Sequence, residues 1–226
     1  GSEMCIRDSH RIVIVGGSGF IGTNLILFLL RQKDLEVFNI DINPPRLRSK
    51  GSHYHSIDIC HLSSFYSCLL EISPDYIVHL AARTDLGGNS LDDYSANTLG
   101  VENLMKILPS LPNLKKIVIT SSMLVCRTGY YPKNQFDYAP STLYGESKVK
   151  TEEIVWHNSP QCDWAIIRPT SIWGPWFGVP YRNFFDMMMA HRYFHIGCKG
   201  CTKTYGYVGN LSLIHISEPT RHAQIS

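Results

Sequence analysis

The stretch Gly16-Gly17-Ser18-Gly19-Phe20-Ile21-Gly22 decides the fold of this chain. It fits GxGxxG from Gly17 and GxxGxxG from Gly16, it follows the β-branched run Arg11–Val15, and it opens the apolar-periodic stretch Phe20–Leu30. A strand, a tight glycine turn and a helix in this order bring backbone N–H groups to the positive end of a helix, where a pyrophosphate binds. The stretch therefore predicts the first βα unit of a dinucleotide-binding sheet.

An acidic residue follows each of the next two predicted strands. Asp41 follows Glu36–Ile40 and stands nineteen residues beyond Gly22. A carboxylate there accepts hydrogen bonds from the adenosine ribose and repels a 2′-phosphate, so Asp41 favours NAD over NADP. The alternative, a glycine turn used for packing with Asp41 as a solvated strand end, explains less of the combined pattern. Asp58 follows His53–Ile57 and is equally consistent with a bond to the adenine amino group and with a solvated loop carboxylate.

Strands alternate with helices along the rest of the chain. Further strands are predicted over Tyr76–Leu80, Lys116–Thr120 and Trp164–Ile167, and helices over Leu91–Leu108 and Tyr144–Trp156. This alternation predicts an α/β fold, a Rossmann-type doubly wound parallel sheet with helices on both faces. We assign residues 10–170 to the NAD-binding domain. Beyond Pro169 the composition turns to Gly, Pro and aromatic residues, which predicts a partial substrate-binding region over 171–210. The aromatic residues of Trp173–Phe184 suit either base stacking or a core.

Both ends of the chain carry segments foreign to this pattern. Met4–Ser9 and Leu211–Arg221 match translations of the two strands of a transposon adapter used in sequencing libraries, and residues 1–3 resemble a tag remnant. We therefore set residues 1–9 and 211–226 aside before considering the fold. We expect the natural sequence to continue beyond Asn210, so that the C-terminal substrate lobe is incomplete in this chain.

Composition excludes several classes of protein. The 226 residues include 44% hydrophobic and 18% charged residues, with 21 Lys and Arg against 19 Asp and Glu. We expect a globular, cytoplasmic protein that binds neither nucleic acid nor membrane, because there is no basic run and no apolar stretch of about 20 residues. The seven cysteines include a single CxxC pair, Cys198 and Cys201, which predicts a turn and neither a disulfide framework nor a zinc site. No metal is expected at His53, His55, Cys60 and His61 either.

A second motif, Tyr144-Gly145-Glu146-Ser147-Lys148, carries candidate catalytic chemistry. Residues i and i+4 share one face of a helix, so Tyr144 and Lys148 point the same way. We expect the ammonium of Lys148 to lower the pKa of Tyr144 toward neutrality, so that the phenol can exchange a proton. Ser122, after a predicted strand, can hold the substrate oxygen while a nicotinamide exchanges hydride. Alone, YxxxK more often marks a helix surface; together with the glycine turn it favours catalysis.

Residues 10–210 resemble the extended short-chain dehydrogenase/reductases, in the branch of NAD-dependent epimerases and dehydratases that act on nucleotide sugars. The resemblance rests on the glycine turn, Asp41, Asp58, His79-Leu80-Ala81-Ala82, Asn97-Thr98-Leu99-Gly100, Thr120-Ser121-Ser122, the YxxxK helix with Glu152, and Arg168-Pro169. It implies that Tyr144 is the acid and base, that Lys148 binds the nicotinamide ribose and tunes Tyr144, and that Ser122 contacts the reacting oxygen.

The resemblance also implies the cofactor contacts and the assembly. The implied NAD-binding residues are Gly16, Gly19, Phe20, Ile21, Gly22, Asp41, Asp58, Ile59, Leu80, Ala81, Ala82, Asn97, Tyr144 and Lys148. Among these, Ala81 and Ala82 would line the cofactor, and Asn97 would support its site from a helix. Tyr205-Gly206-Tyr207-Val208 resembles a strand that precedes the last shared segment of the family. A homodimer formed through helices is the implied assembly.

Departures from the family pattern narrow the function. Met123 and Leu124 follow Ser122 where the 4,6-dehydratases carry Asp and Glu, which disfavours a dehydratase. Cys126-Arg127 replaces an aromatic-glycine pair, which leaves the shape of the sugar pocket open. The leading interpretation is an NAD-dependent nucleotide-sugar epimerase that removes and returns a hydride through a keto intermediate. The alternatives are a net oxidoreductase of a sugar, steroid or small carbonyl substrate, and a non-catalytic dinucleotide-binding module, which usually lacks the tyrosine or the lysine.

Overall fold

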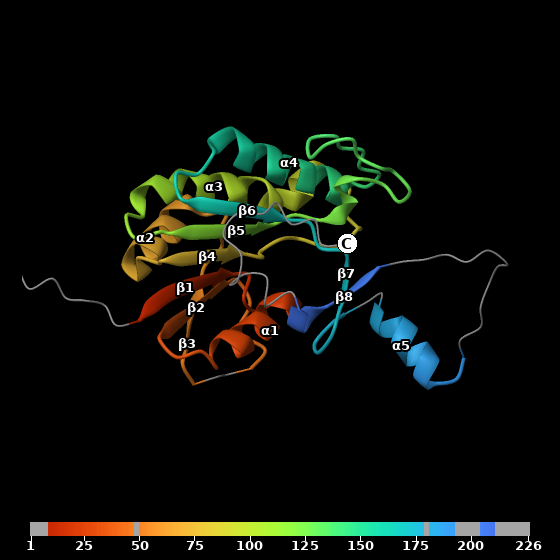
Figure 1. Cartoon of the computed structure of the whole chain (residues 1–226), viewed down its shortest axis with the longest axis horizontal. Helices are drawn as coiled ribbons and strands as arrows, with labels where there is room; N and C mark the ends of the chain where they lie inside the picture. Colours follow the sequence, from red (N-terminus) through yellow and green to blue (C-terminus); the bar gives the residue numbers. More distant parts are fainter. Residues whose placement is uncertain (1–8, 48–49, 179–180, 193–203, 211–226) are drawn as a thin grey trace, which may run out of the picture.

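The main sheet of the molecule is parallel and six-stranded. The computed structural model describes residues 9–47, 50–178, 181–192 and 204–210. The strands are β1 His10–Val15, β2 Leu35–Asp41, β3 Ser52–Ser56, β4 Tyr76–His79, β5 Lys116–Thr120 and β6 Asp163–Ile167, in the order β3-β2-β1-β4-β5-β6 (Figure 1). This order confirms the predicted Rossmann-type sheet. The order in which successive strands are added to the sheet reverses between β1 and β4. Folds of this kind bind their ligands at this point, at the carboxyl ends of the strands.

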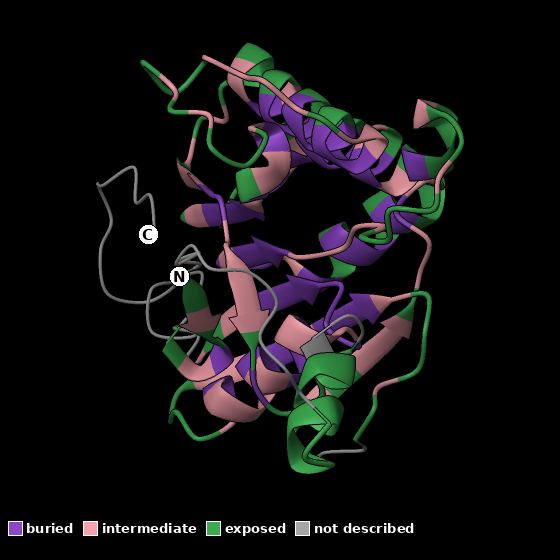
Figure 2. Cartoon of the chain, turned by 90° about the vertical axis from the view of Figure 1, so that its right-hand side faces the viewer, coloured by how far each residue is buried: buried purple, intermediate pink, exposed green. Residues whose placement is uncertain are grey.

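Helices cover both faces of this sheet. They are α1 Phe20–Leu29, α2 Leu62–Ile72, α3 Leu99–Ile107 and α4 Leu143–Asn158, with short 3-10 segments η1 Leu91–Asn97, η2 Leu108–Ser110 and η3 Met123–Val125. Alternation along β1 assigns the faces: Ile12 and Ile14 pack with Leu25 of α1, whereas Val13 and Val15 belong to the cluster that includes residues of α2, α3 and α4. Figure 2 shows the buried residues gathered in the strands and in the inward faces of these helices.

The predicted helix over Leu91–Leu108 is wrong as a single element. The chain forms η1 and then α3, with non-helical angles at Tyr94 and with φ −114° and ψ −77° at Thr98. The break follows from contacts with distant segments. The Asn97 side chain hydrogen-bonds to the Arg83 backbone and to the Ser147 hydroxyl, and these bonds fix the backbone just before α3 begins. Helix α2 is absent from the sequence-based prediction, although Phe65, Leu69 and Ile72 recur at helical spacing and are buried.

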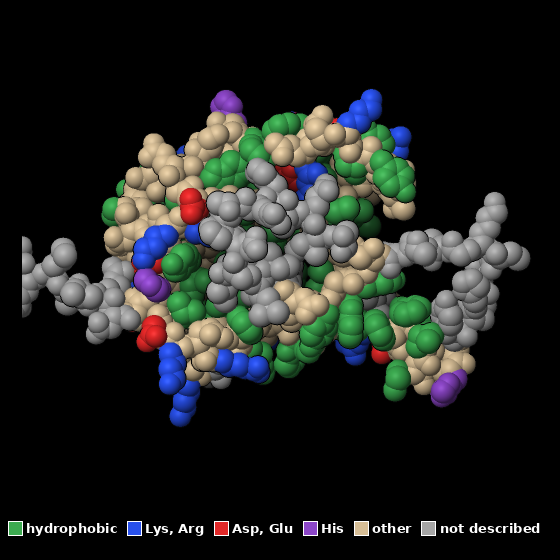
Figure 3. Space-filling view, viewed as in Figure 1, with side chains coloured by type: hydrophobic (Ala, Val, Ile, Leu, Met, Phe, Trp, Pro, Cys, Tyr) green, Lys and Arg blue, Asp and Glu red, His purple; other side chains and the backbone are tan. Residues whose placement is uncertain are grey.

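The described part of residues 171–210 stands apart from the main sheet. It contains α5, Tyr181–Met189, and a two-stranded parallel sheet of β7, Ser171–Trp173, and β8, Tyr205–Tyr207. The family-based expectation of a strand beginning at Tyr205 is therefore confirmed. Apolar side chains of α5 are exposed, among them Phe184, Phe185 and Met189 (Figures 2 and 3). The division into domains stays a proposal.

Several sequence-based interpretations fall on parts of the chain that the structure leaves undescribed. Residues 1–8 and 211–226, which include nearly all of the adapter-like segments, and the cysteines Cys198 and Cys201 lie outside the described residues. Within the described ranges, no group of three or more His, Cys, Asp or Glu side chains is arranged to hold a metal ion. Over the same ranges, every helix is too short or too polar to cross a lipid bilayer.

Candidate active site

The glycine turn leaves the N-terminus of α1 open at the carboxyl edge of the sheet. No side chain caps this end of the helix, and its first turn holds no acidic residue. Gly16 has a φ of +88°, and a Cβ there would lie 2.5 Å from the backbone nitrogen of Ala81; a Cβ at Gly22 would lie 2.5 Å from the Gly16 carbonyl oxygen. Only glycine fits both positions. The resulting bare backbone beside a positive helix end can accept a pyrophosphate.

Asp41 lies beside this turn, as the spacing predicts. One of its carboxylate oxygens accepts a bond from the Ser18 backbone N–H at 3.0 Å, and the other accepts from the Asn43 N–H at 2.9 Å. The Ser18 hydroxyl in turn donates to the Asn43 carbonyl at 2.7 Å, and the Arg46 Nε donates to the Ser18 carbonyl at 3.1 Å. These bonds hold the carboxylate at the end of β2 against the glycine turn, which suits an acid that binds the adenosine ribose.

The segment after β3 positions the remaining adenine-side candidates. Asp58 accepts a bond from the Cys60 backbone N–H at 2.9 Å and its side chain is partly exposed. Ile59 is buried, and the Asn103 side chain of α3 donates to the Ile59 and Cys60 carbonyls at 2.9 and 3.0 Å. The turn is therefore anchored to α3, while a bond from Asp58 to adenine stays a prediction.

Asn97 connects the segment after β4 to helix α4. The backbone N–H groups of Leu80 and Ala81 both donate to the Val15 carbonyl, which brings this segment against the glycine turn. The Asn97 side chain accepts from the Arg83 N–H at 2.8 Å and donates to the Arg83 carbonyl at 3.0 Å and to the Ser147 hydroxyl at 2.8 Å. Asn97 is fully buried and joins the segment after β4 to α4, the helix that carries Tyr144.

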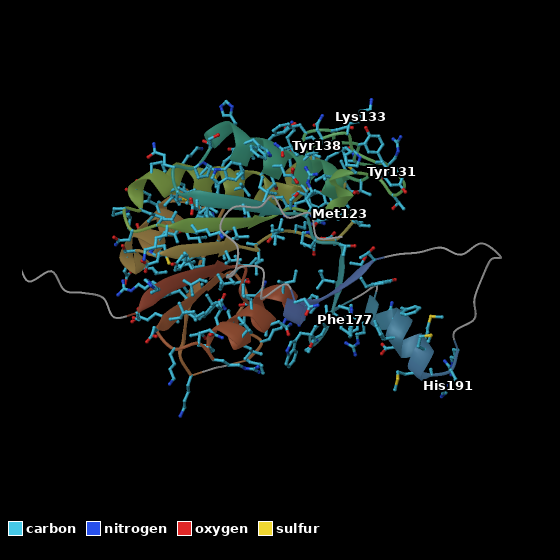
Figure 4. The ribbon with its side chains drawn as sticks, in the orientation of Figure 1. Met123, Tyr131, Lys133, Tyr138, Phe177 and His191 are labelled. Carbon is cyan, nitrogen blue, oxygen red and sulfur yellow. The ribbon has the colours of Figure 1, made fainter. Side chains whose placement is uncertain are left out.

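The structure brings Tyr144, Ser122 and Lys148 together. The Ser122 hydroxyl is hydrogen-bonded to the Tyr144 phenol and also accepts from the Leu124 backbone N–H at 3.1 Å. Lys148, one helical turn beyond Tyr144, donates from Nζ to the Thr120 carbonyl at 2.9 Å. Figure 4 shows Met123, the residue after Ser122, at the carboxyl end of the sheet below the segment that carries Tyr131 and Tyr138.

The predicted lowering of the Tyr144 pKa by Lys148 is wrong for the chain as described. Burial raises the pKa of Tyr144, and the hydrogen bond with Ser122 opposes that rise. Lys148 directs its ammonium to the Thr120 carbonyl, and it is itself 3% exposed. Burial lowers the pKa of Lys148 to about 8, while the charge of Glu152 opposes the lowering. Desolvation therefore decides the direction of the shift in the pKa of both Tyr144 and Lys148.

Tyr94 belongs to this site although sequence reasoning missed it. Its ring is fully buried, with its centroid 6.3 Å from that of Tyr144, and its hydroxyl donates to the Asp85 carbonyl at 2.9 Å. The Arg83 guanidinium lies 5.2 Å from the centre of the Tyr94 ring and pairs with the Asp85 carboxylate at 2.7 Å. The sequence offers one signal for Tyr94, its place as an aromatic residue three positions before Asn97.

His79 at the end of β4 gives the site a pH-dependent stability. The side chain is 1% exposed, and neither ring nitrogen has a partner among the described residues. Burial, with a contribution from the Lys148 charge, lowers the pKa of His79 to about 3.

We expect the free energy of unfolding to fall as pH falls from about 6.5 toward 3, by about 1.4 kcal/mol per pH unit from this group, because only the unfolded chain binds the proton there. Denaturant unfolding of the chain and of His79→Leu at several pH values measures this. An equal acid slope in both proteins would contradict it.

The comparisons place these residues in a known family. The model described as NAD dependent epimerase/dehydratase family matches residues 12–196. A GDP-6-deoxy-D-talose 4-dehydrogenase of Aggregatibacter actinomycetemcomitans is 30% identical over 73% of this chain and 53% of its own length. An N-acetyl-alpha-D-glucosaminyl-diphospho-ditrans,octacis-undecaprenol 4-epimerase of Escherichia coli O157:H7 is 28% identical over 90% of this chain and 61% of its own length. The chain thus spans about half to three fifths of the curated relatives it matches.

A solved structure confirms the fold at lower identity. The UDP-glucose 4-epimerase of Thermotoga maritima, solved with UDP-glucose, superposes with a TM-score of 0.76 at 19% identity, over 91% of this chain and 72% of the other. The family match covers most of the chain, and the glycine turn, the strand order and the YxxxK helix agree with the resemblance read from the sequence. The chain belongs to the NAD-dependent epimerase/dehydratase family.

Proposed function

We propose that this chain is the cofactor-binding and catalytic portion of an NAD-dependent nucleotide-sugar epimerase. The observation that carries the proposal is the meeting of Tyr144, Ser122 and Lys148 at the carboxyl edge of the sheet that also presents the open glycine turn. A phenol, a hydroxyl and an ammonium at the edge that binds a dinucleotide are what reversible oxidation of an alcohol requires. A non-catalytic binding module gives no reason to bury Lys148.

The residues that would hold NAD lie along one edge of the sheet. The pyrophosphate would lie on the N-terminus of α1 at Gly16, Gly19 and Gly22, with Phe20 and Ile21 beside it, and Asp41 would bind the adenosine ribose. Asp58 and Ile59 would lie at the adenine, while Leu80, Ala81, Ala82 and Asn97 would line or support the site, and Tyr144 and Lys148 would face the nicotinamide ribose. When bound, NAD supplies a reversible acceptor for the hydride of an alcohol carbon.

The chain's own side chains would manage the proton of that alcohol. Tyr144, as the phenolate, would take the hydroxyl proton of the sugar as its carbon gives up hydride, which leaves a ketone and a neutral phenol. The proton would return to the oxygen once hydride re-enters the carbon from the other face of the rotated sugar, so protons and electrons balance over the cycle. Ser122 would hold the reacting oxygen beside Tyr144. The Lys148 ammonium would stabilise the phenolate that takes the proton and that re-forms when the proton returns to the sugar.

The residues after Ser122 favour an epimerase over a dehydratase. Met123 is exposed and Leu124 follows it, so this edge offers no carboxylate to remove water at the positions next to Ser122.

We assign residues 171–210 to part of the substrate-binding region, in which the Trp173 ring lies 5.0 Å from that of Tyr207. The proposal includes a homodimer as the assembly and the cytoplasm as the location.

A net oxidoreductase is the second candidate, because the GDP-sugar relative is a 4-dehydrogenase. Incubating the protein with NAD and a panel of UDP-, GDP- and dTDP-sugars, and following both sugar stereochemistry and the absorbance of the reduced nicotinamide, separates the two. An epimerase interconverts the sugars with no steady change in absorbance. Continuous production of reduced cofactor by every active substrate would favour the dehydrogenase.

Asp41 leads us to expect a preference for NAD over NADP. The 2′-phosphate would meet the Asp41 carboxylate, which Ser18 and Asn43 hold in place, and a repulsion of about 1.4 kcal/mol corresponds to a tenfold difference in affinity. Titration calorimetry with both cofactors should therefore give at least about tenfold tighter binding of NAD than of NADP. Asp41→Asn should reduce this difference in affinity. Equal or tighter NADP binding by the unsubstituted chain would remove Asp41 from the ribose site.

A further inference from the structure

A buried ion pair lies one helical turn beyond Lys148. The Arg168 Nε donates to one Glu152 oxygen at 2.8 Å and its Nη2 donates to the other at 2.6 Å. The side chains of Glu152 and Arg168 are 1% and 9% exposed. A charged pair so fully withdrawn from water is costly to bury and adds little net stability compared with apolar residues. Stability alone therefore does not explain why the Glu152–Arg168 pair is buried.

Glu152 stands one helical turn from Lys148 on α4. Tyr144, Lys148 and Glu152 stand at i, i+4 and i+8 of α4 and so lie along one stripe of the helix. The titratable groups near Lys148 come from several elements: His79 from β4, Tyr144 and Glu152 from α4 itself, and Arg168 behind Glu152 from the end of β6. His79 is neutral near pH 7, and the Lys148 Nζ donates to the Thr120 carbonyl, so Glu152, one helical turn away, supplies the negative charge that favours the ammonium.

The pair also holds the segment 126–140. The Arg168 Nη2 donates to the Gln135 carbonyl at 2.6 Å, and the Tyr138 hydroxyl donates to Glu152 at 2.9 Å. The Arg168 guanidinium also lies 5.4 Å from the centre of the Tyr138 ring. This segment runs from the η3 turn after Ser122 toward the start of α4. Figure 4 shows its labelled residues Tyr131, Lys133 and Tyr138 near the amino end of α4, at the carboxyl edge of the sheet.

We propose that Glu152 and Arg168 form a positioning pair, which supports the Lys148 ammonium through the carboxylate and fastens the segment 126–140 to the catalytic helix through the guanidinium. The inference rests on the proposed function, in which Lys148 acts beside Tyr144. It adds a physical link between the charge of Lys148 and the placement of the segment next to Ser122, because both depend on the same two side chains.

The first arm of the test measures the titration of Lys148. The signal of isotope-labelled lysine is followed by NMR against pH in the full chain, with Lys148→Arg used for assignment. Glu152→Gln should lower the midpoint by about one pH unit, since it removes the neighbouring carboxylate and leaves Arg168 in place. The matched control is Glu153→Gln on the same helix, where the native pair with Lys150 is exposed; its Lys148 midpoint should not move.

The second arm measures the segment 126–140 and remains decisive if Glu152→Gln does not fold. Arg168→Lys keeps a positive charge for Glu152 but cannot also reach the Gln135 carbonyl. Hydrogen exchange of the Arg127 and Ala139 amides, which bond within and beside this segment, should accelerate several-fold, while amides of β1 keep their rates. An unmoved Lys148 midpoint in folded Glu152→Gln, or unchanged exchange in Arg168→Lys, overturns the proposal. Both arms need no substrate, so an absent epimerase activity would leave their outcome intact.

Discussion

Tyr144→Phe should lower kcat by about a thousandfold on an identified sugar nucleotide and leave NAD affinity within about twofold, because proton transfer contributes a factor of about 10²–10⁴. The substitution removes one oxygen from a ring that stays buried against Tyr94 and that the Ser122 hydroxyl bonds. Losing transition-state stabilisation lowers kcat with little change in ground-state binding. Turnover and cofactor affinity are measured side by side on the unsubstituted protein and on the variant.

Two control variants define what this result means. Tyr66→Phe removes an exposed phenol hydroxyl from α2, and it should keep most of the turnover because α2 carries none of the proposed site residues. Ser122→Ala should lower kcat less than Tyr144→Phe, because it removes the partner of the acid and base and spares the acid itself. Near-normal turnover by Tyr144→Phe would mean that another group moves the proton.

Local spacing explains why part of this site could be predicted. The strand order near the glycine turn, the place of Asp41 beside Ser18 and the shared face of Tyr144 and Lys148 depend on residues that are neighbours in sequence or follow one βα unit. Such patterns constrain the backbone directly, so the sequence predicts them. The strand β5, predicted over Lys116–Thr120, has those bounds in the structure.

The parts that could not be predicted depend on contacts between distant segments. The approach of Tyr94 to Tyr144 joins residues fifty positions apart, and the break before α3 follows from bonds of Asn97 to Arg83 and Ser147. The pKa of Lys148 is likewise set mainly by burial, and the i,i+4 spacing does not predict burial. The spacing identifies the two partners, and only the packed environment decides which electrostatic effect dominates.

Lys148→Met should stabilise the chain in the absence of cofactor while weakening NAD binding by about tenfold or more. Burial lowers the pKa of Lys148 from 10.5 to about 8, so at pH 7 the folded chain bears the full cost of a desolvated ammonium, about 3 kcal/mol. Methionine removes that cost but leaves the Thr120 carbonyl without its donor, which costs about 1–2 kcal/mol. The net expectation is a gain of about 1–2 kcal/mol in the free energy of unfolding at pH 7.

The pH profile distinguishes this mechanism from general improvement of packing. Between about pH 8 and 10.5 the unfolded chain binds more protons at this lysine than the folded chain, so the stability of the unsubstituted protein should rise with pH in that window. Lys148→Met should lack the rise. Lys150→Met, at an exposed position of the same helix, should keep it. A buried ammonium that lowers the stability of the chain without cofactor is explained by its use in the reaction. Parallel pH profiles of the unfolding free energy for all three proteins would show that Lys148 does not lower the stability of the folded chain.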